Sequence, residues 1–393
     1  MPDRVSVTSS QSWFSRLSES IKSVVFGIAL FVIAFPVLFW NEGRAVKTAR
    51  SLTEGAGLVV PVSPDAVDPA NNGKLVHVSA FTATEDVLVD DTFGVSENAI
   101  QLARQVEMYQ WVEDESSTSE TKLGGSKETT TTYDYSTEWK SSLIDSNSFH
   151  SPDGHQNPKA LPFEGRTERA TNVTLGAFTL ADSQIADLDK SEPLRLSSIP
   201  PNVQGAKLHD GYVYIGSDPS SPSVGDARVK FSVVRPGAVS VVARQAGSTF
   251  SPYQAKAGGQ VFLLQEAIVS ADAMFETAQR SNAMMTWILR GVGFFMMFFG
   301  LSMVFAPLAV FGDVVPLVGR VLGAGTSIVA GFLAAFFAVG TIAIAWITYR
   351  PLLGVILLLL AAGAVFLLVR VARKRSAATG PPPIPRQRPA EAD

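Results

Sequence analysis

Four apolar stretches stand out along the chain, because each is long enough to cross a lipid bilayer as a helix. The first covers residues 23–40 and holds no charged side chain, and the other three follow one another towards the C-terminal end. A hydrocarbon core of about 30 Å requires about 20 apolar residues in a helix. The pattern therefore predicts four transmembrane helices, at residues 23–40, 286–311, 321–349 and 351–371.

Residues 41–285, between the first two of these helices, alternate mainly with a period of two, which is typical of β-strands. The alternating runs 106–112 and 131–139 predict a hairpin. The segment 114–130 between them holds mostly Ser, Thr, Glu and Gly, so it is either a mobile loop or an extension of the hairpin ribbon. The expected fold class is a membrane protein with four transmembrane α-helices, one N-terminal and three C-terminal, plus a large β-rich α+β domain outside the cytoplasm.

Further turn and cap signals subdivide this region. The runs 231–234 and 239–244 flank an Arg-Pro-Gly sequence, which predicts a second hairpin. Ser96 is a candidate N-cap for a helix over 98–105. Ser270 is a candidate N-cap for an amphipathic helix over 271–282, which leads directly into the second crossing and couples the domain to the helix bundle.

The two ends of the chain carry weaker patterns. Within residues 1–22, apolar side chains recur at helical spacing from Trp13 onwards, which predicts a cytoplasmic segment with an amphipathic helix in the membrane interface. A frayed tail is the alternative for this segment. Residues 372–393 are basic and rich in proline, and a disordered cytoplasmic tail is expected there.

Charge divides the chain in the same way as hydropathy does. The formal net charge of −4 combines a net −11 over residues 41–285 with a net +7 over the rest. An acidic domain argues against nucleic acid as a partner. The basic cluster Arg370, Arg373, Lys374 and Arg375 follows the last helix, and the positive-inside rule places it in the cytoplasm. Four crossings then put both termini in the cytoplasm and residues 41–285 in the periplasm or a lumen.

Two sets of residues are candidates for roles at the membrane. The predicted membrane-interface residues are Trp13, Trp40, Arg44, Trp346 and Tyr349. The predicted helix-packing residues are Gly319, Gly323, Gly325 and Gly331, which serve either packing within the bundle or contact between protomers. Glu42 and Arg44 are expected to pair with each other, with Arg290 or with lipid headgroups, and to set the angle between domain and membrane.

No sequence pattern for catalysis or cofactor binding is present. The chain lacks cysteine, which excludes disulfides and thiolate metal sites. His150 and His155 lie in a turn-rich loop, and Gly291-Val292-Gly293 lies inside an apolar helix instead of following a strand. We expect no catalytic residues, no cofactor and no metal, and therefore no enzymatic activity.

Several short motifs resemble those of the transmembrane protein 43 family, also called LUMA. They include Asn41-Glu42-Gly43-Arg44, Glu107-Met108-Tyr109-Gln110-Trp111, Gly154-His155-Gln156-Asn157-Pro158 and Arg280-Ser281-Asn282. The resemblance covers residues 24–371 and implies one crossing, a large lumenal or periplasmic domain, three closing crossings and self-association. Animal members reside in the endoplasmic reticulum and inner nuclear membrane with lamins and emerin. The cysteine-free chain, its Ala-rich bundle and its Pro-rich tail look more like a bacterial member in the inner membrane, without lamin binding.

The expected function is a self-associating scaffold that organises or maintains the membrane. Its partners are the lipid bilayer, further copies of the chain and other membrane proteins. One alternative is an envelope sensor whose domain binds a ligand and signals to the bundle through residues 271–282. Another is an ion channel, in which an oligomer lines a pore with Thr326, Ser327 and Thr341.

Overall fold

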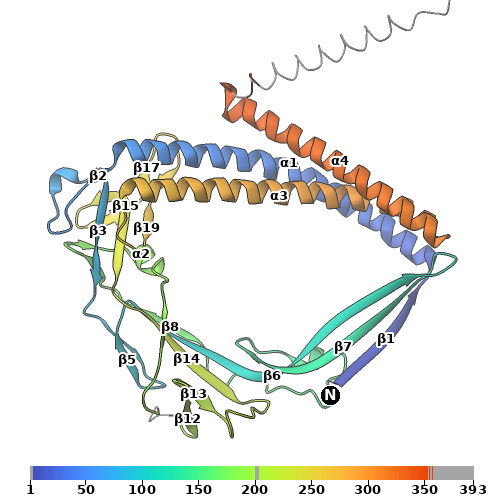
Figure 1. The fold of residues 1–393 in the computed structure, drawn as a ribbon, viewed down its shortest axis with the longest axis horizontal. Coiled ribbons are helices and arrows are strands. Elements are labelled where there is room, and N and C mark those ends of the chain that lie inside the picture. The colour runs from blue at the N-terminus through green and yellow to red at the C-terminus, as the bar shows by residue number, and fades with distance from the viewer. Residues whose placement is uncertain (1–2, 200–202, 353, 355, 357–393) are drawn as a thin grey trace, which may run out of the picture.

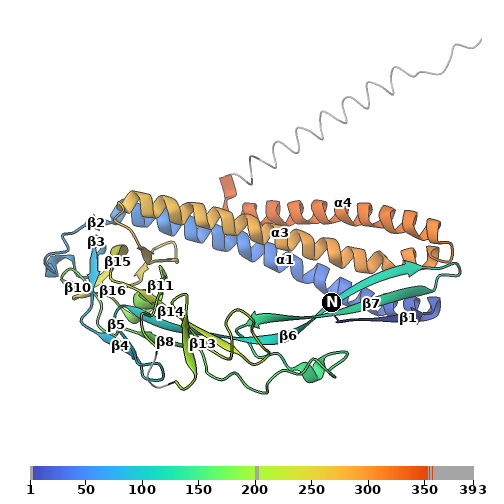
Figure 2. The same ribbon diagram turned by 60° about the horizontal axis from the view of Figure 1, so that its bottom comes forward.

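A computed structural model of the chain describes residues 3–199, 203–352, 354 and 356. Three long helices form one side of the molecule: α1 (Trp13–Leu58), α3 (Ala271–Gly312) and α4 (Pro316–Tyr349). Two β-sheets form the rest, and Figures 1 and 2 show the chain closing into a loop of helices and sheets. The three helices are long and apolar enough to cross a membrane, which confirms three of the predicted crossings. The predicted fourth, at 351–371, lies outside the described residues apart from its start.

The helices pack tightly because glycine lets their backbones approach each other. α1 and α3 run antiparallel over almost their whole length (Figure 1). A Cβ atom added at Gly27 would lie 2.6 Å from the carbonyl oxygen of Gly300, and one at Gly300 would lie 2.7 Å from that of Gly27. α4 packs against this pair through Ala334 and Ala338, which are buried. We call α1, α3 and α4 the helix layer.

The strands form two main sheets. Sheet A has the order β1-β7-β6-β14-β13-β12, with β8 beside β6 and β11 beside β14. Its strands are β1 (Asp3–Gln11), β6 (Gln101–Thr121), β7 (Lys127–Lys140), β8 (Arg166–Arg169), β11 (Glu192–Leu194), β12 (Ala206–His209), β13 (Tyr212–Ile215) and β14 (Ala227–Val234). Sheet B has the order β19-β15-β16-β10-β9-β3-β2. Its strands are β2 (Val60–Pro61), β3 (Leu75–Ala83), β9 (Thr174–Leu175), β10 (Phe178–Thr179), β15 (Ala238–Ala246), β16 (Thr249–Ser251) and β19 (Leu263–Gln265).

Smaller elements complete the domain. They are the pairs β4 (Val87–Asp90) with β5 (Val95–Asn98) and β17 (Tyr253–Gln254) with β18 (Gln260–Val261), the helix α2 (Asp182–Ala186), and two 3₁₀ turns at Pro69–Asn71 and Ser146–Ser148. Each sheet has its own apolar core. A third cluster joins sheet B to the helix layer, where Leu52 of α1 and Phe275 of α3 pack against Leu75 of β3.

Two local predictions for this domain are wrong. The strands on either side of Arg-Pro-Gly exist, but they do not pair with each other: β14 pairs with β6 in sheet A, and β15 pairs with β3 in sheet B. The turn therefore links two sheets instead of closing a hairpin. The predicted helix at 98–105 is replaced by the end of β5 and the start of β6, because Leu102 and Val106 are buried in the core of sheet A.

The predicted hairpin is confirmed and is longer than expected. β6 and β7 pair from Met108↔Lys140 to Thr121↔Lys127, so the segment 114–130 extends the ribbon. β1 adds a third strand, antiparallel to β7, with the register Gln11↔Lys127. We call β1 and the outer parts of β6 (112–121) and β7 (127–136) the ribbon. The sequence predicted an interfacial helix within 1–22; the structure instead has β1 there, followed by α1, which starts at Trp13 without a separate helix.

The tip of the ribbon contacts the end of the helix layer that is remote from sheet B (Figures 1 and 2). Arg16 of α1 donates a hydrogen bond to the carbonyl oxygen of Gly125, at 2.6 Å, and forms an ion pair with Asp313, which follows α3. The amide of Gly124 donates to the carbonyl oxygen of Val314. Gly125 has a positive φ of 80°, so glycine is favoured at this turn. We call these contacts the tip clasp.

The pairing of β1 with β7 and the tip clasp differ from the sides of the membrane that the sequence predicted for these segments. The sequence assigned residues 1–22 and 41–285 to opposite sides of the bilayer, whereas the structure joins parts of both segments in one sheet. Sheet B contacts α1 beyond the uncharged stretch 23–40, and the tip contacts α1 before it. The sheets and the ribbon therefore extend past the whole uncharged stretch of α1, from the contact with sheet B beyond it to the tip clasp before it.

One carboxylate holds the base of the ribbon to the rest of sheet A. Glu107 on β6 accepts hydrogen bonds from Arg228, at 2.5 Å, and Lys230, at 2.9 Å, on β14. Burial acts to raise the pKa of Glu107, but the bonds from the two cations outweigh it, so this pKa lies below its usual value of 4.5. The carboxylate is therefore stabilised in its charged form by the fold.

We expect Glu107→Gln to lower the thermal midpoint of the protein at neutral pH and to have little effect in acid. The pKa of Glu107 is lower in the folded than in the unfolded chain, so its contribution is present above the unfolded value of about 4.5 and is lost as the pH falls through the folded value. Midpoints of both proteins should be measured from pH 7 to pH 3. A difference between them that is the same at every pH would contradict this role.

Candidate functional site at the junction of three helices

A group of polar side chains lies where the uncharged stretch of α1 ends, and it involves all three described long helices. Its members, which we call the junction cluster, are Asn41, Glu42, Arg44, Asn282, Thr286, Arg290 and Trp346. Asn41 and Glu42 are fully buried. Polar groups removed from water in this way need internal partners, and the cluster provides them.

Helical spacing explains why these side chains meet. On α3, Asn282, Thr286 and Arg290 recur every four residues and therefore lie along one face. On α1, Asn41 and Arg44 share the face that meets α3. Because the two helices are antiparallel, a residue further along α1 meets a residue that comes earlier in α3. Asn41 is accordingly bonded to Thr286, and Arg44 to Asn282.

Glu42 is the centre of the charged part of the cluster. Its two carboxylate oxygens accept hydrogen bonds from Arg290 Nε, at 2.6 Å, and Arg290 Nη2, at 2.9 Å. The second oxygen also accepts one from Trp346 Nε1 of α4, at 2.7 Å. The Arg290 guanidinium lies 4.7 Å from the ring centroid of Trp287 and 5.7 Å from that of Trp346. A bidentate arginine pair with aromatic cover is a strong form of buried ion pair.

On the Arg44 side of the cluster, the guanidinium cation donates its hydrogen bonds to neutral groups. Arg44 donates to Asn282 Oδ1, at 3.0 Å, and to Asn41 Oδ1 and Thr286 Oγ1, both at 3.2 Å. Asn282 in turn donates to the carbonyl oxygen of Ala45, at 3.0 Å. The buried Nε of Arg44 has no hydrogen-bond partner. No acidic side chain pairs with Arg44 among these contacts, so its positive charge is not neutralised within the cluster.

This geometry fits a structural role better than a chemical one. Both oxygens of Glu42 are held by donors on two other helices, so the carboxylate joins α1 to α3 and α4. Among the residues that the structure describes, no group of three or more His, Asp or Glu side chains is arranged to hold a metal ion. The junction cluster is best described as a lock that fixes the relative position of three helices.

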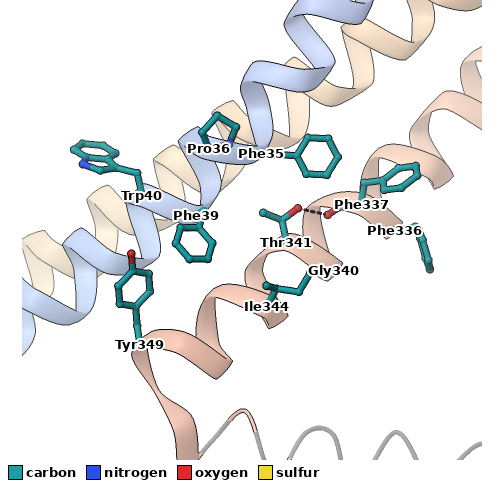
Figure 3. A pocket seen from close by; sticks show the side chains of 10 residues that line it. All are labelled: Phe35, Pro36, Phe39, Trp40, Phe336, Phe337, Gly340, Thr341, Ile344 and Tyr349. Atoms are coloured by element: carbon teal, nitrogen blue, oxygen red, sulfur yellow. Dashed lines mark hydrogen bonds between the residues drawn. The ribbon is translucent and has the colours of Figure 1, made fainter.

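The structure places the five predicted membrane-interface residues at two levels of the helix layer, one near the tip clasp and one near the junction cluster. Trp13 lies at the tip clasp, where its Nε1 donates to the carbonyl oxygen of Val310, at 2.8 Å. Trp346 and Arg44 belong to the junction cluster. Trp40 is 60% exposed and lies near Tyr349, whose ring contacts Phe39 and the backbone of Gly43 (Figure 3).

The four predicted packing glycines have different surroundings. Gly319 is close-packed, because an added Cβ would meet Asp313 at the turn between α3 and α4. Gly323 and Gly331 have only ordinary contacts, and Gly325 has no neighbour within 4 Å. Two backbones come close together at Gly27 and Gly300, which the sequence interpretation missed. The sequence pattern that could have indicated them was a glycine within each of two predicted transmembrane helices.

Sequence reasoning offered Arg290 as one of three partners for Glu42, and the structure selects it. It did not identify Asn282, Thr286 or Trp346 as parts of the same cluster. The available signal was the recurrence of polar residues every four positions at the edge of an apolar helix. The partner helix and its register were needed to see that these residues face Asn41 and Arg44.

Comparisons with known proteins place the chain among membrane proteins. Residues 108–351 match the family model described as Transmembrane protein 43. The chain is 37% identical over 384 residues to Transmembrane protein 43 of Homo sapiens, covering 95% of this chain and 94% of the relative. It is 37% identical over 364 residues to that of Rattus norvegicus (89% and 90%) and 33% identical over 357 residues to the Transmembrane protein 43 homolog of Drosophila melanogaster (87% and 94%). No solved structure matches the chain.

We expect Glu42→Gln to lower the free energy of unfolding by about 3 kcal/mol, because it leaves the Arg290 guanidinium buried without a counter-charge. Arg290→Gln should cost a similar amount. The double variant should cost clearly less than the two single variants together, since no unpaired charge remains. Unfolding of the detergent-solubilised full-length chain provides the measurement.

The matched control is Glu276→Gln, which breaks the ion pair with Arg280 on the exposed face of α3, where the two side chains are 64% and 77% exposed. We expect this change to cost no more than about 0.5 kcal/mol. Costs at Glu42 and Arg290 that simply add, or that equal the cost at Glu276, would show that the buried pair does not lock the helices.

Proposed function

The chain belongs to the transmembrane protein 43 family, and from this premise we propose that it is a non-enzymatic membrane scaffold whose copies associate through the edges of the ribbon. Three apolar helices anchor it in the bilayer. The junction cluster joins these helices to one another, and α3 continues without interruption from the membrane to the sheets. Such a chain is suited to holding a large domain in a fixed position at a membrane.

The observation that carries this proposal is the polar ribbon and its two free edges. β1 pairs with β7 alone among the described strands, so its other edge is open over nine residues. β6 pairs with β14 only as far as Met108, and Asn157 bonds the backbone of Trp111. From residue 112 to the tip, the outer edge of β6 has no strand partner within the described chain. Both edges belong to one sheet, and because both strands are antiparallel to β7 they are parallel to each other.

In a single copy, these sheet edges would leave backbone hydrogen-bonding groups unpaired at the level of the hydrocarbon, which is unfavourable. When α1 spans the bilayer, the ribbon reaches from sheet A to the far end of α1 and so passes the level of the hydrocarbon (Figure 2). Most of its side chains are Ser, Thr, Glu, Asp or Lys. Lipid-exposed sheet edges do not occur within hydrocarbon, although backbone of this kind is tolerated inside protein or beside a water-filled space. Pairing of β1 in one copy with β6 in the next covers one edge of each copy, and a continued or closed series of copies covers both edges.

The proposal includes an orientation. The start of α1, the tip of the ribbon and the C-terminal tail lie on the cytoplasmic side of a bacterial inner membrane, and sheet B and the part of sheet A outside the ribbon lie in the periplasm. Because β1 runs back from the tip along β7 to place Asp3 beside Tyr135, the cytoplasmic position expected for residues 3–11 is not kept. The support is the basic cluster Arg370, Arg373, Lys374 and Arg375, which lies outside the described residues. Other membrane proteins are further partners in this proposal, since a scaffold presents the faces of sheets A and B to the periplasm.

The channel alternative gains no support from α4. The hydroxyl of Thr326 donates to carbonyl oxygens of Leu322 and Gly323, and that of Ser327 donates to Gly323. Thr341 donates in the same way to Phe337. Each of these hydroxyls donates its proton within its own helix, so these contacts give no indication of a polar lining along α4.

Cysteine cross-linking tests the self-association, since the natural chain has no cysteine. Ser6 of β1 and Ser116 of β6 both lie opposite Thr132 of β7. Two strand spacings separate them by about 9.5 Å within one copy, whereas a disulfide requires Cα atoms closer than about 7 Å. A Ser6→Cys, Ser116→Cys double variant should therefore form covalent dimers and higher species in native membranes.

The control is the pair Ser6→Cys and Thr132→Cys, which should form a disulfide within one chain and report that β1 is in place. A second control co-expresses the two single variants, which should give a dimer without higher species. Monomers alone from the Ser6, Ser116 variant, with the control disulfide formed, would overturn association through these edges.

A further inference from the structure

Two hollows adjoin each other between α1 and α4, and their linings differ in chemistry. The first is a groove of about 830 Å³ with an apolar lining. Figure 3 shows Phe35 and Phe39 of α1 on one side and Phe337 and Ile344 of α4 on the other. Thr341 also lines the groove, but its hydroxyl donates to the carbonyl oxygen of Phe337 and is therefore already satisfied.

The second hollow, of about 480 Å³, is basic. Arg44, Lys47 and Arg50 line it, and no acidic side chain is among the described residues that do so. Arg44 Nε is buried without a hydrogen-bond partner. Trp40 and Tyr349 line both hollows, so the apolar groove and the basic pocket lie next to each other.

The order of the two hollows along α1 matches the order of layers in a bilayer. The groove lies beside the end of the uncharged stretch 23–40, which is the level of the acyl chains. The basic pocket begins at Trp40 and extends about three helical turns further, to Arg50, which is the level of the headgroups. Basic pockets between transmembrane helices suit anionic headgroups, and both volumes are typical of ligand sites.

We propose that this composite site binds one anionic glycerophospholipid. An acyl chain lies in the groove against Phe35, Phe39 and Phe337, and the phosphate lies in the basic pocket near Lys47 and Arg50. Among the described side-chain nitrogen and oxygen atoms of the junction cluster, the buried Arg44 Nε is the one that lacks a hydrogen-bond partner, and a phosphate oxygen is an acceptor of the kind it needs. The lipid would then brace α4 against α1 beside the lock formed by Glu42 and Arg290.

The test uses full-length protein in detergent, titrated with dioleoyl phosphatidylglycerol and separately with dioleoyl phosphatidylcholine. Binding is followed by native mass spectrometry and by the thermal midpoint. We expect saturable binding and a raised midpoint with phosphatidylglycerol, and much weaker effects with phosphatidylcholine. Lys47→Gln should weaken binding about fivefold, the factor for one cation near an anionic lipid. Arg280→Gln, which removes an exposed cation outside both hollows, should not weaken it.

A second pair of variants tests the groove. A Cβ atom added at Gly340 or at Gly325 meets nothing within 4 Å, and only Gly340 lines the groove. Gly340→Phe should therefore remove phosphatidylglycerol binding, and Gly325→Phe should retain it. Inorganic phosphate alone should neither bind detectably nor raise the midpoint.

Three results would overturn the proposal. They are equal binding of the two lipids, binding of phosphate alone with no effect of Gly340→Phe, and no lipid binding at all, as expected if another part of the chain fills the groove. Because none of these measurements depends on contact between copies, their outcome is independent of the cross-linking result.

Discussion

Lipid hydrocarbon offers no hydrogen-bond partners, and this constraint governs how the whole chain is arranged. The apolar surfaces of α1, α3 and α4 satisfy it directly, because a helix bonds its own backbone. The ribbon does not satisfy it, since β1 and β6 present open edges and polar side chains. The tip clasp nevertheless holds the ribbon at the far end of the helices, through Arg16, Gly125 and Asp313. The constraint can be met only if protein or water, instead of lipid, surrounds the ribbon.

The same constraint explains the junction cluster. Glu42 and Asn41 are fully buried at the end of an apolar stretch, where an unpaired polar group is most costly. The bidentate contact with Arg290 and the bond from Trp346 remove that cost and at the same time connect three helices. Arg44 is left with a buried donor and an uncompensated charge, and the basic pocket opens beside it. The ion pair and the proposed lipid site thus both compensate buried polar groups at one level of the membrane.

Much of this architecture could be predicted from sequence, because hydropathy and alternation are local signals. The helix capped by Ser270, the β6–β7 pairing and three crossings follow directly from such patterns. The other features depend on contacts between residues that are far apart in the sequence. Nothing local in residues 3–11 indicates that they pair with β7, and the Arg-Pro-Gly turn looks the same whether it closes a hairpin or links two sheets. Likewise, Asn282 and Thr286 acquire a role only when the antiparallel register with α1 is known.

The central claim is that the tip of the ribbon and sheet B lie on opposite sides of the membrane, and thiol labelling tests it most directly. Leu123 at the tip is 84% exposed, and Phe81 on β3 is 72% exposed. Leu123→Cys and Phe81→Cys, each the only cysteine in its chain, are expressed in bacterial spheroplasts and treated with a bulky maleimide that does not cross membranes. The account predicts that the reagent labels Cys at position 81 from outside and labels position 123 only after permeabilisation. Equal labelling of both positions from the same side would contradict it.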